Sequence, residues 1–482
     1  MSQVSDLKLR ALRNALSTAT GHIDDLERAW LLFSGATGEH VQTLWYDYLV
    51  NVAASPVAPR HINDMFYEWL GLLGFTGALD DRWLQFWGDY GTFPTTFIDF
   101  RTRSVMAPFV FTRASTEMDV SDGGVLSQKA VNTPAYYKNQ GLIMEDTRTN
   151  ALTFSEDMGN AIYTRSNLTV SANSDFAPDS SLTADKLLET ATPSVTHIFS
   201  TAADLPSAGD VCFSFFVKAA GRNKFAVVVG AVQSVFDLAT GQLNSPNLNV
   251  YMDSIGSGWW RISLGFTNVG VGIKPQIVFL TDALQSSYTG DITKGLLIWG
   301  AQVEVGTWVS GYIPTNGATA TRTNPTFFAP SVSIPSFSLT NFAVELLISP
   351  MYRYSQPHLT TKILSIRTDG NNRFEIEYFG SQDQLQITRI HGGVQGYILT
   401  AAGLTNYPRG SDLKVRVSHS TTAGLSVSIN DAPAGADASA NAKTVWSTPI
   451  PTNIGLGVRD TGAGVMWSFL KYFKYWNAPT LL

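Results

Sequence analysis

Apolar residues near the start of the chain recur at alternating spacings of three and four, which predicts amphipathic α-helix. Gly21 interrupts this stripe, and Asp24 and Asp25 suit the first turn of a new helix, so we expect two helices here. The stripe fits the core of an ordinary helical domain, which we favour, or the seam of a coiled coil. It consists of Leu9, Leu12, Leu16, Ala19, Ile23, Leu26, Trp30 and Phe33.

Further helical segments are predicted at 39–54, 58–73 and 79–87, and Pro56 and Pro59 separate the first two. Residues 1–90 are therefore expected to form a helical domain. From Gly91 onward the helical period is lost, and residues 91–150 are predicted to be a β-rich connector with short strands.

Beyond residue 150, short alternating runs separated by turn residues predict two antiparallel β-sandwiches, at 151–322 and 323–482. The fold class we expect is thus an α plus all-β multidomain chain, with a helical domain followed by two jelly-roll sandwiches. Predicted strands of the first sandwich are 197–201, 211–219, 224–229, 233–238, 259–266 and 276–280. Those of the second are 342–349, 362–367, 373–378, 384–390, 412–419, 425–429, 452–457 and 467–476.

One stretch, Leu296–Val305, is predicted to close the first sandwich as a half-buried strand at period two. Gly306 then breaks the strand, and a polar linker over 317–322 leaves the domain. Side chains expected on one face are Trp299, Ala301, Val303 and Val305, and those expected on the other are Gly300, Gln302 and Glu304.

Composition narrows the class. Charged residues make up 15% of the chain, aromatic residues 12%, and there are 40 glycines, which suits turn-rich β-structure with broad contact surfaces. The net charge of −6 gives no support for a nucleic-acid partner. The single cysteine, Cys212, cannot form an internal disulfide and is predicted to be a small buried apolar residue. No segment has the length and apolarity of a membrane span, and the polar first residues predict synthesis and folding in a cytosol.

A set of ordered motifs runs over roughly residues 111–322. They are Phe111–Ser115, Gly123–Leu126, Asn132–Pro134, Gly141–Glu145, Thr147–Asn150, Asp179–Leu187, Phe213–Ala219, Gly256–Arg261, Trp299–Gly306, Tyr312–Thr315 and Thr321–Arg322. In this order they resemble a carbohydrate-binding-like β-sandwich found in bacteriophage virion proteins, and the motifs from Trp299 onward resemble its close. The resemblance implies a phage structural or adhesion protein, assembled in the host cytoplasm and carried on the virion. The second sandwich resembles the concanavalin-like or laminin-G-like jelly roll in its strand order.

The helical domain is rich in large aromatic residues. A domain of about ninety residues can bury only some of them, so we predict an exposed apolar surface that docks on other virion proteins. The alternative is a plain helical core. The residues assigned to docking are Trp45, Tyr48, Trp69, Trp83 and Trp87.

No catalytic constellation stands out, and no catalytic residue is assigned. The chain has no HExxH, nucleophile elbow, phosphate loop or dinucleotide fingerprint. Glycan cleavage needs two carboxylates across the scissile bond. Glu375 and Glu377 share a strand face, but this spacing predicts a solvated face, and we expect no enzyme.

Binding is the better prediction, because sugars are held by aromatic platforms flanked by amides and carboxylates. For each ring the alternative is core or rim packing. No cofactor is assigned, and structural calcium is left open at Asp146, Asp179 and Glu304. The carbohydrate-binding candidates are Trp259, Trp260, Trp308, Tyr312, Tyr378 and Tyr397.

These observations favour a phage fibre, spike or collar protein that attaches to host surface polysaccharide. We expect a homo-oligomer, most simply a trimer, because several weak sugar sites acting together give tight attachment. The alternatives are a tailspike-type polysaccharide depolymerase and a purely structural collar or capsid decoration protein.

Overall fold

The fold was analysed in a computed structural model, which divides into two compact units, residues 1–93 and 94–482. The structure describes residues 96–477 apart from 104–108, 203–208, 246–248, 270–272, 307, 335–336, 351–359, 380–383, 401–409, 447–450, 452 and 458–467. The predicted helical domain, with its docking residues Trp45, Tyr48, Trp69, Trp83 and Trp87, lies outside the described residues.

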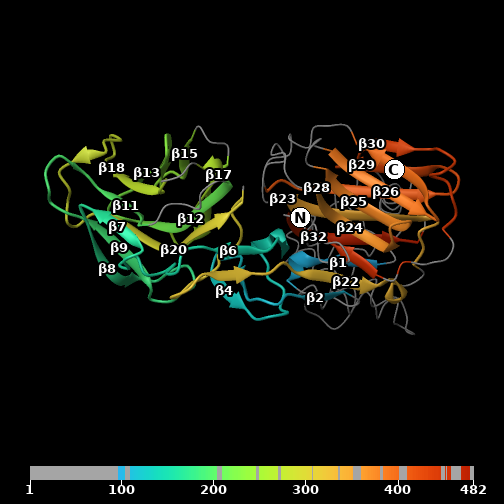
Figure 1. The fold of residues 1–482 in the computed structure, drawn as a ribbon, viewed down its shortest axis with the longest axis horizontal. Helices are drawn as coiled ribbons and strands as arrows, with labels where there is room; N and C mark the ends of the chain where they lie inside the picture. Colours follow the sequence, from blue (N-terminus) through green and yellow to red (C-terminus); the bar gives the residue numbers. More distant parts are fainter. Residues whose placement is uncertain are drawn as a thin grey trace, which may run out of the picture. The chain divides into compact units, whose positions relative to one another are not determined.

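The described part of the chain is nearly all β and its sheets are antiparallel (Figure 1). Within it the helical turns are three short 3-10 segments, η2 (Phe100–Thr102), η3 (Lys138–Gln140) and η4 (Ser331–Ser333). None of the described helices is long and apolar enough to cross a membrane.

The first sandwich consists of two six-stranded sheets. One runs β15 (Gln242–Asn244), β14 (Val232–Asp237), β13 (Lys224–Val229), β18 (Gln276–Leu280), β11 (Ile198–Thr201) and β7 (Tyr163–Ser166). The other runs β16 (Val250–Gly256), β17 (Trp259–Val269), β12 (Gly209–Ala220), β20 (Gly295–Val305), β9 (Ala184–Glu189) and β8 (Leu168–Asp175). Cys212 is buried in β12, as predicted.

The second sandwich has two seven-stranded sheets. The first runs β1 (Thr96–Asp99), β32 (Ser468–Trp476), β23 (Phe342–Pro350), β28 (Leu413–Ser420), β29 (Gly424–Ile429) and β30 (Ala432–Asp437), and β5 (Leu142–Met144) also pairs with β32. The second runs β2 (Val110–Thr112), β22 (Thr326–Pro330), β31 (Asn453–Leu456), β24 (Thr360–Asp369), β25 (Asn372–Phe379), β26 (Gln384–His391) and β27 (Val394–Leu399).

The segment predicted to be a connector is part of this second sandwich. Its strand β1 lies beside β32, near the other end of the chain, and β2 lies beside β22 (Figure 1). Thr96 pairs with Tyr475 in the first of these ladders. Phe100 and Met144 are buried in the same core as Phe473. The first sandwich is therefore an insertion between β5 and β22.

Two short ladders flank this insertion. A hairpin of β3 (Glu117–Val120) and β4 (Leu126–Lys129) packs its apolar side chains into one cluster with residues of β17 and β20. Strand β6 (Arg148–Asn150) enters the first sandwich, β21 (Ala320–Arg322) leaves it, and the two strands pair. The entry and exit of the inserted domain are thereby tied together.

The alternation predicted along β20 is wrong at one point. Gly300 has a φ of +63°, and the pairing of β20 with β12 shifts register there, as at a β-bulge. Trp299 therefore packs into the cluster that contains Trp259, whereas Ala301 and Val303 pack into the core between the two sheets. Both faces are buried as far as Glu304, and Val305 is exposed.

Candidate functional site

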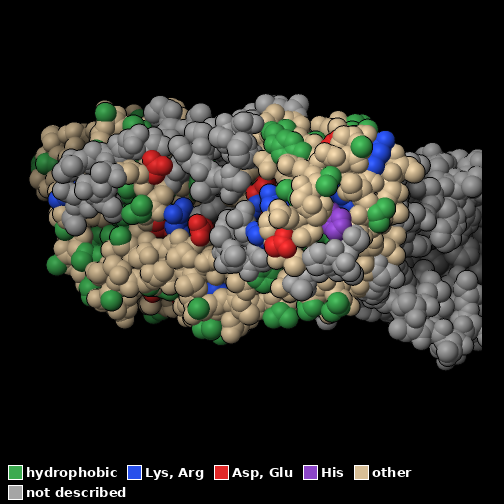
Figure 2. Space-filling model, turned by 45° about the vertical axis from the view of Figure 1, so that its right-hand side comes forward, with side chains coloured by type: hydrophobic (Ala, Val, Ile, Leu, Met, Phe, Trp, Pro, Cys, Tyr) green, Lys and Arg blue, Asp and Glu red, His purple; other side chains and the backbone are tan. Residues whose placement is uncertain are grey.

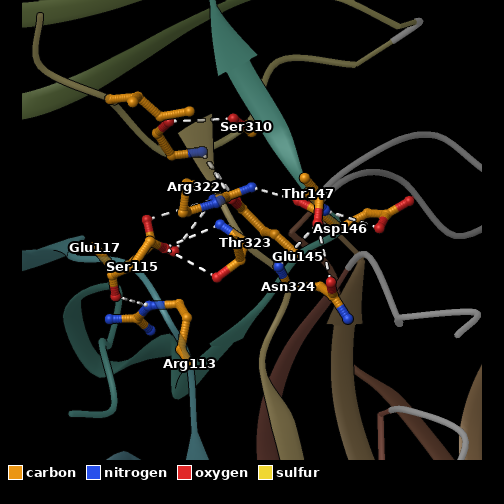
Figure 3. Close-up of polar contacts among 12 residues, drawn as sticks. Arg113, Ser115, Glu117, Glu145, Asp146, Thr147, Ser310, Arg322, Thr323 and Asn324 are labelled. Carbon is orange, nitrogen blue, oxygen red and sulfur yellow. Dashed lines mark hydrogen bonds and ion pairs between the residues drawn. The ribbon is translucent and has the colours of Figure 1, made fainter. Parts of the chain in front are cut away.

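The motifs that carry the family resemblance meet at one buried polar group, which we call the Arg322 cluster (Glu117, Glu145, Asp146, Gly311 and Arg322; Figure 3). The Arg322 guanidinium forms ion pairs with Glu117, at 3.2 Å, and with Glu145, and it donates to the Asp146 carbonyl at 2.8 Å. Glu145 also accepts the Gly311 N–H at 2.9 Å. All three charged side chains are buried, so they stabilise one another in place of water.

Around this cluster, motif side chains bond mainly to backbone. Ser115 accepts the Thr323 N–H at 2.9 Å, and Thr147 accepts the Asn324 N–H at 3.0 Å (Figure 3). Asn150 donates to the Ile313 carbonyl at 2.9 Å. These contacts join segments on either side of the insertion, which gives the motif residues an architectural role.

The calcium candidates are engaged in local hydrogen bonds. Glu304 is buried and accepts the Ser310 N–H at 3.0 Å. Asp146 accepts the Thr147 N–H at 2.8 Å (Figure 3), and Asp179 accepts the Ser181 N–H at 2.9 Å. Among the described residues, no group of three or more His, Cys, Asp or Glu side chains is placed to hold a metal ion.

Most of the predicted sugar-binding rings face protein. Trp259, Trp308, Tyr312 and Tyr378 are buried, so their rings contact other side chains instead of water. Trp260 is half-buried, and its ring lies against the Gly241 turn. Tyr397 on β27 is 37% exposed and keeps an accessible ring. The buried rings, like Trp299, match the core-packing alternative.

The ring that is well exposed beside a hollow is one that the sequence reasoning missed. Phe176, in the loop after β8, is 61% exposed and borders a hollow of about 280 Å³, which we call the Phe176 hollow. Beneath it the buried Trp259 donates its indole N–H to the Phe176 carbonyl at 3.2 Å. Its signal in the sequence is an aromatic residue amid the loop-forming residues Asp175, Pro178 and Asp179.

The rest of the Phe176 hollow is lined mainly by apolar side chains and glycines, and by one ion pair. The Lys218 ammonium donates to Asp175 at 2.8 Å, and this bond lowers the pKa of the Asp175 carboxyl. The far wall is the β3–β4 turn, where Gly124 has a φ of +83° and lies so close to the Ile255 carbonyl that a Cβ would overlap it. Glycine at this position therefore allows the turn to sit against β16 and form the wall.

Few charged side chains are seen on the face drawn in Figure 2, and they form small groups between broad areas of backbone and neutral side chains.

Glu375 and Glu377 are not solvated, contrary to the sequence prediction. Both are buried, and both form ion pairs with the buried Lys362, at 3.1 Å for Glu375. Arg373 adds a second cation 3.3 Å from Glu375. The two carboxylates therefore belong to an ion network within the sheet.

His391 and His419 each lie near the buried Arg389 in the second sandwich. Arg389 donates to the carbonyls of Leu339 and Thr444, and His391 stacks on Trp446. His419 is buried, with Nε2 2.6 Å from the Ala442 carbonyl. Burial, and then the nearby Arg389 charge, lower the pKa of His419 from 6.5 to about 4.

This depressed pKa predicts acid sensitivity. As the pH falls below 6.5, the unfolded chain takes up a proton at residue 419 before the folded chain does, so stability present above pH 6.5 is lost towards pH 4. The loss between pH 7.5 and pH 5 is expected to be about 2 kcal/mol. Urea unfolding of the second sandwich at both pH values, in the wild type and in His419→Asn, measures it. An equal pH dependence in the two proteins would contradict the prediction.

Comparisons with known proteins add little. No protein-family model matches the sequence, and no curated protein matches it. Among solved structures, the chain is similar to the receptor-binding domain of botulinum neurotoxin mosaic serotype C/D (8% identity, TM-score 0.27, 33% of this chain and 37% of that one). It is also similar to the Ruminococcus gnavus IT-sialidase CBM40 bound to α2,3-sialyllactose (11% identity, TM-score 0.25, 30% of this chain and 79% of that one). The match spans just over a third of the length of the neurotoxin domain.

Proposed function

We propose that this chain is a bacteriophage virion attachment protein, a tail fibre, spike or collar fibre, that holds a host surface glycan at the Phe176 hollow. Residues 1–90 dock on other virion proteins, and the sandwiches are displayed for attachment. The ordered motifs over residues 111–322 support the phage assignment. We further propose that the chain forms a trimer. Sedimentation of the full chain would measure the mass of this oligomer.

The observation that carries the glycan proposal is the exposed Phe176 ring beside a hollow whose lining includes the Asp175–Lys218 ion pair. An aromatic face packs against the apolar face of a pyranose, and the Asp175–Lys218 pair offers both an acceptor and a donor to ring hydroxyls. Asp175 also accepts the Phe176 N–H at 2.8 Å, which fixes the loop that carries the ring. The site therefore presents an ordered platform without enclosing its ligand.

Replacing Phe176 with alanine is expected to weaken binding to host polysaccharide about 5- to 10-fold per site, because a ring contact is worth roughly 1 kcal/mol beyond the buried area. Biosensor measurement of the full chain against immobilised capsule or lipopolysaccharide tests this. Val332→Ala is the matched control, because Val332 is 89% exposed and does not line this hollow.

If Phe176→Ala binds host polysaccharide as tightly as the wild type does, the Phe176 hollow is not the glycan site. If the wild type does not bind host polysaccharide at all, a structural collar or decoration role is favoured instead. An increase in reducing ends during incubation would favour the depolymerase.

A further inference from the structure

A second hollow in the first sandwich has chemistry different from the Phe176 hollow. It is an open hollow with a volume of about 470 Å³, within the range of small-molecule sites, and we call it the acidic hollow. Strands β8 and β9, the loop after β6 and the segment 314–316 form its walls. Its principal polar residues are Glu156, Asp157, Asn173, Thr183, Asp185 and Thr315.

Three carboxylates line the acidic hollow, and no lysine or arginine is among the described residues that line it. Glu156 accepts the Tyr312 hydroxyl at 2.8 Å, and burial raises the pKa of its carboxyl. Asp185 accepts the N–H groups of Met158 and Asn173, both at 2.8 Å, which orients it. The hollow therefore carries fixed acceptors and an uncompensated negative charge.

A second observation points to a ligand. Thr315 lines the acidic hollow and is only 7% exposed, yet its hydroxyl has no hydrogen-bond partner. A buried hydroxyl without a partner is costly, and a bound polar group would satisfy it. Among the described residues, the three carboxylates do not form a group that could hold a metal ion.

We propose that the acidic hollow binds an amino sugar with a free amine. The ammonium group would be attracted by Glu156, Asp157 and Asp185. The sugar hydroxyls would donate hydrogen bonds to lone pairs of these carboxylate oxygens that local hydrogen bonds do not use. Phe154, half-buried at the wall, offers apolar contact to the ring. The site is separate from the Phe176 hollow, and either one stands if the other fails.

The test uses calorimetry of the full chain with a glucosamine tetramer and with its N-acetylated counterpart, which has the same frame without the charge. At least a 10-fold preference for the free amine is expected, and it should shrink as salt is added. Equal affinity for the two tetramers, or no binding of either, would overturn the proposal.

Variants locate the site. Asp157→Asn and Glu156→Gln preserve shape and remove one charge each, and each should weaken binding of the glucosamine tetramer about 3- to 10-fold. Asp431→Asn removes an exposed carboxylate of the second sandwich, and Phe176→Ala alters the other hollow, so both should bind as the wild type does. Unchanged affinity in both acidic-hollow variants would refute the assignment.

Discussion

Replacing Arg322 with methionine is expected to lower the free energy of unfolding by about 3–5 kcal/mol. The change leaves the buried carboxylates of Glu117 and Glu145 without their shared cation, and it removes the bond to the Asp146 carbonyl. Loss of one partner from a buried ion pair costs far more than loss of an exposed one, because the remaining charge cannot be solvated. Urea unfolding followed by tryptophan fluorescence measures the effect.

The control for Arg322→Met is Lys414→Met. Lys414 pairs with Asp431, whose side chain is largely exposed, and the expected change is below about 1 kcal/mol. Adding Glu117→Gln and Glu145→Gln to Arg322→Met should recover part of the lost free energy of unfolding, because the two carboxylates no longer carry a buried charge without a partner cation. A triple variant no more stable than Arg322→Met would show that packing, and not charge, is responsible.

Replacing Trp299 with alanine is expected to cost about 3–5 kcal/mol, as for other fully buried large side chains. The indole packs against Tyr312, with ring centroids 4.8 Å apart, and against Phe216 at 5.4 Å, and it donates to Thr183 at 3.0 Å. Its removal leaves a cavity beneath the acidic hollow, of which Thr183 is a wall.

Tyr397→Ala is the comparison for Trp299→Ala, because the Tyr397 ring is partly exposed on the edge strand β27. Its expected loss of unfolding free energy is within about 0.5 kcal/mol. Thermal unfolding of both variants tests the pair. Similarly small losses of stability in Trp299→Ala and Tyr397→Ala would mean that neighbouring side chains fill the cavity left by the Trp299 indole.

Local pattern predicted many of the strands. All fifteen strands predicted after residue 150 are present within a few residues of their predicted ends, because alternation and turn chemistry are encoded locally. Other strands, among them β8, β16 and β27, were not predicted. The polar residues Asp369–Asn372 join β24 to β25 in a hairpin, as their composition favours. The faces of β20 were misassigned because a bulge at Gly300 changes the period, and nothing in a single glycine distinguishes a bulge from a regular position.

Long-range association was less predictable. That β1 and β5 pair with β32 depends on partners more than three hundred residues away, which strand propensity does not specify. Burial of Glu375 and Glu377 likewise depends on what covers the sheet. Aromatic candidates were chosen by residue type, whereas exposure decides which ring a ligand can reach, and this singled out Phe176.

The insertion of one sandwich between β5 and β22 sets an order of events during translation. Strands β7 to β20 emerge as a contiguous set and can close on themselves while later residues are still being made. Strands β1 and β5 must wait for residues 468–476, because their pairing with β32 cannot form until then. The inserted module is therefore a nascent-chain folding unit, whereas its host sandwich is completed only when its last strand leaves the ribosome.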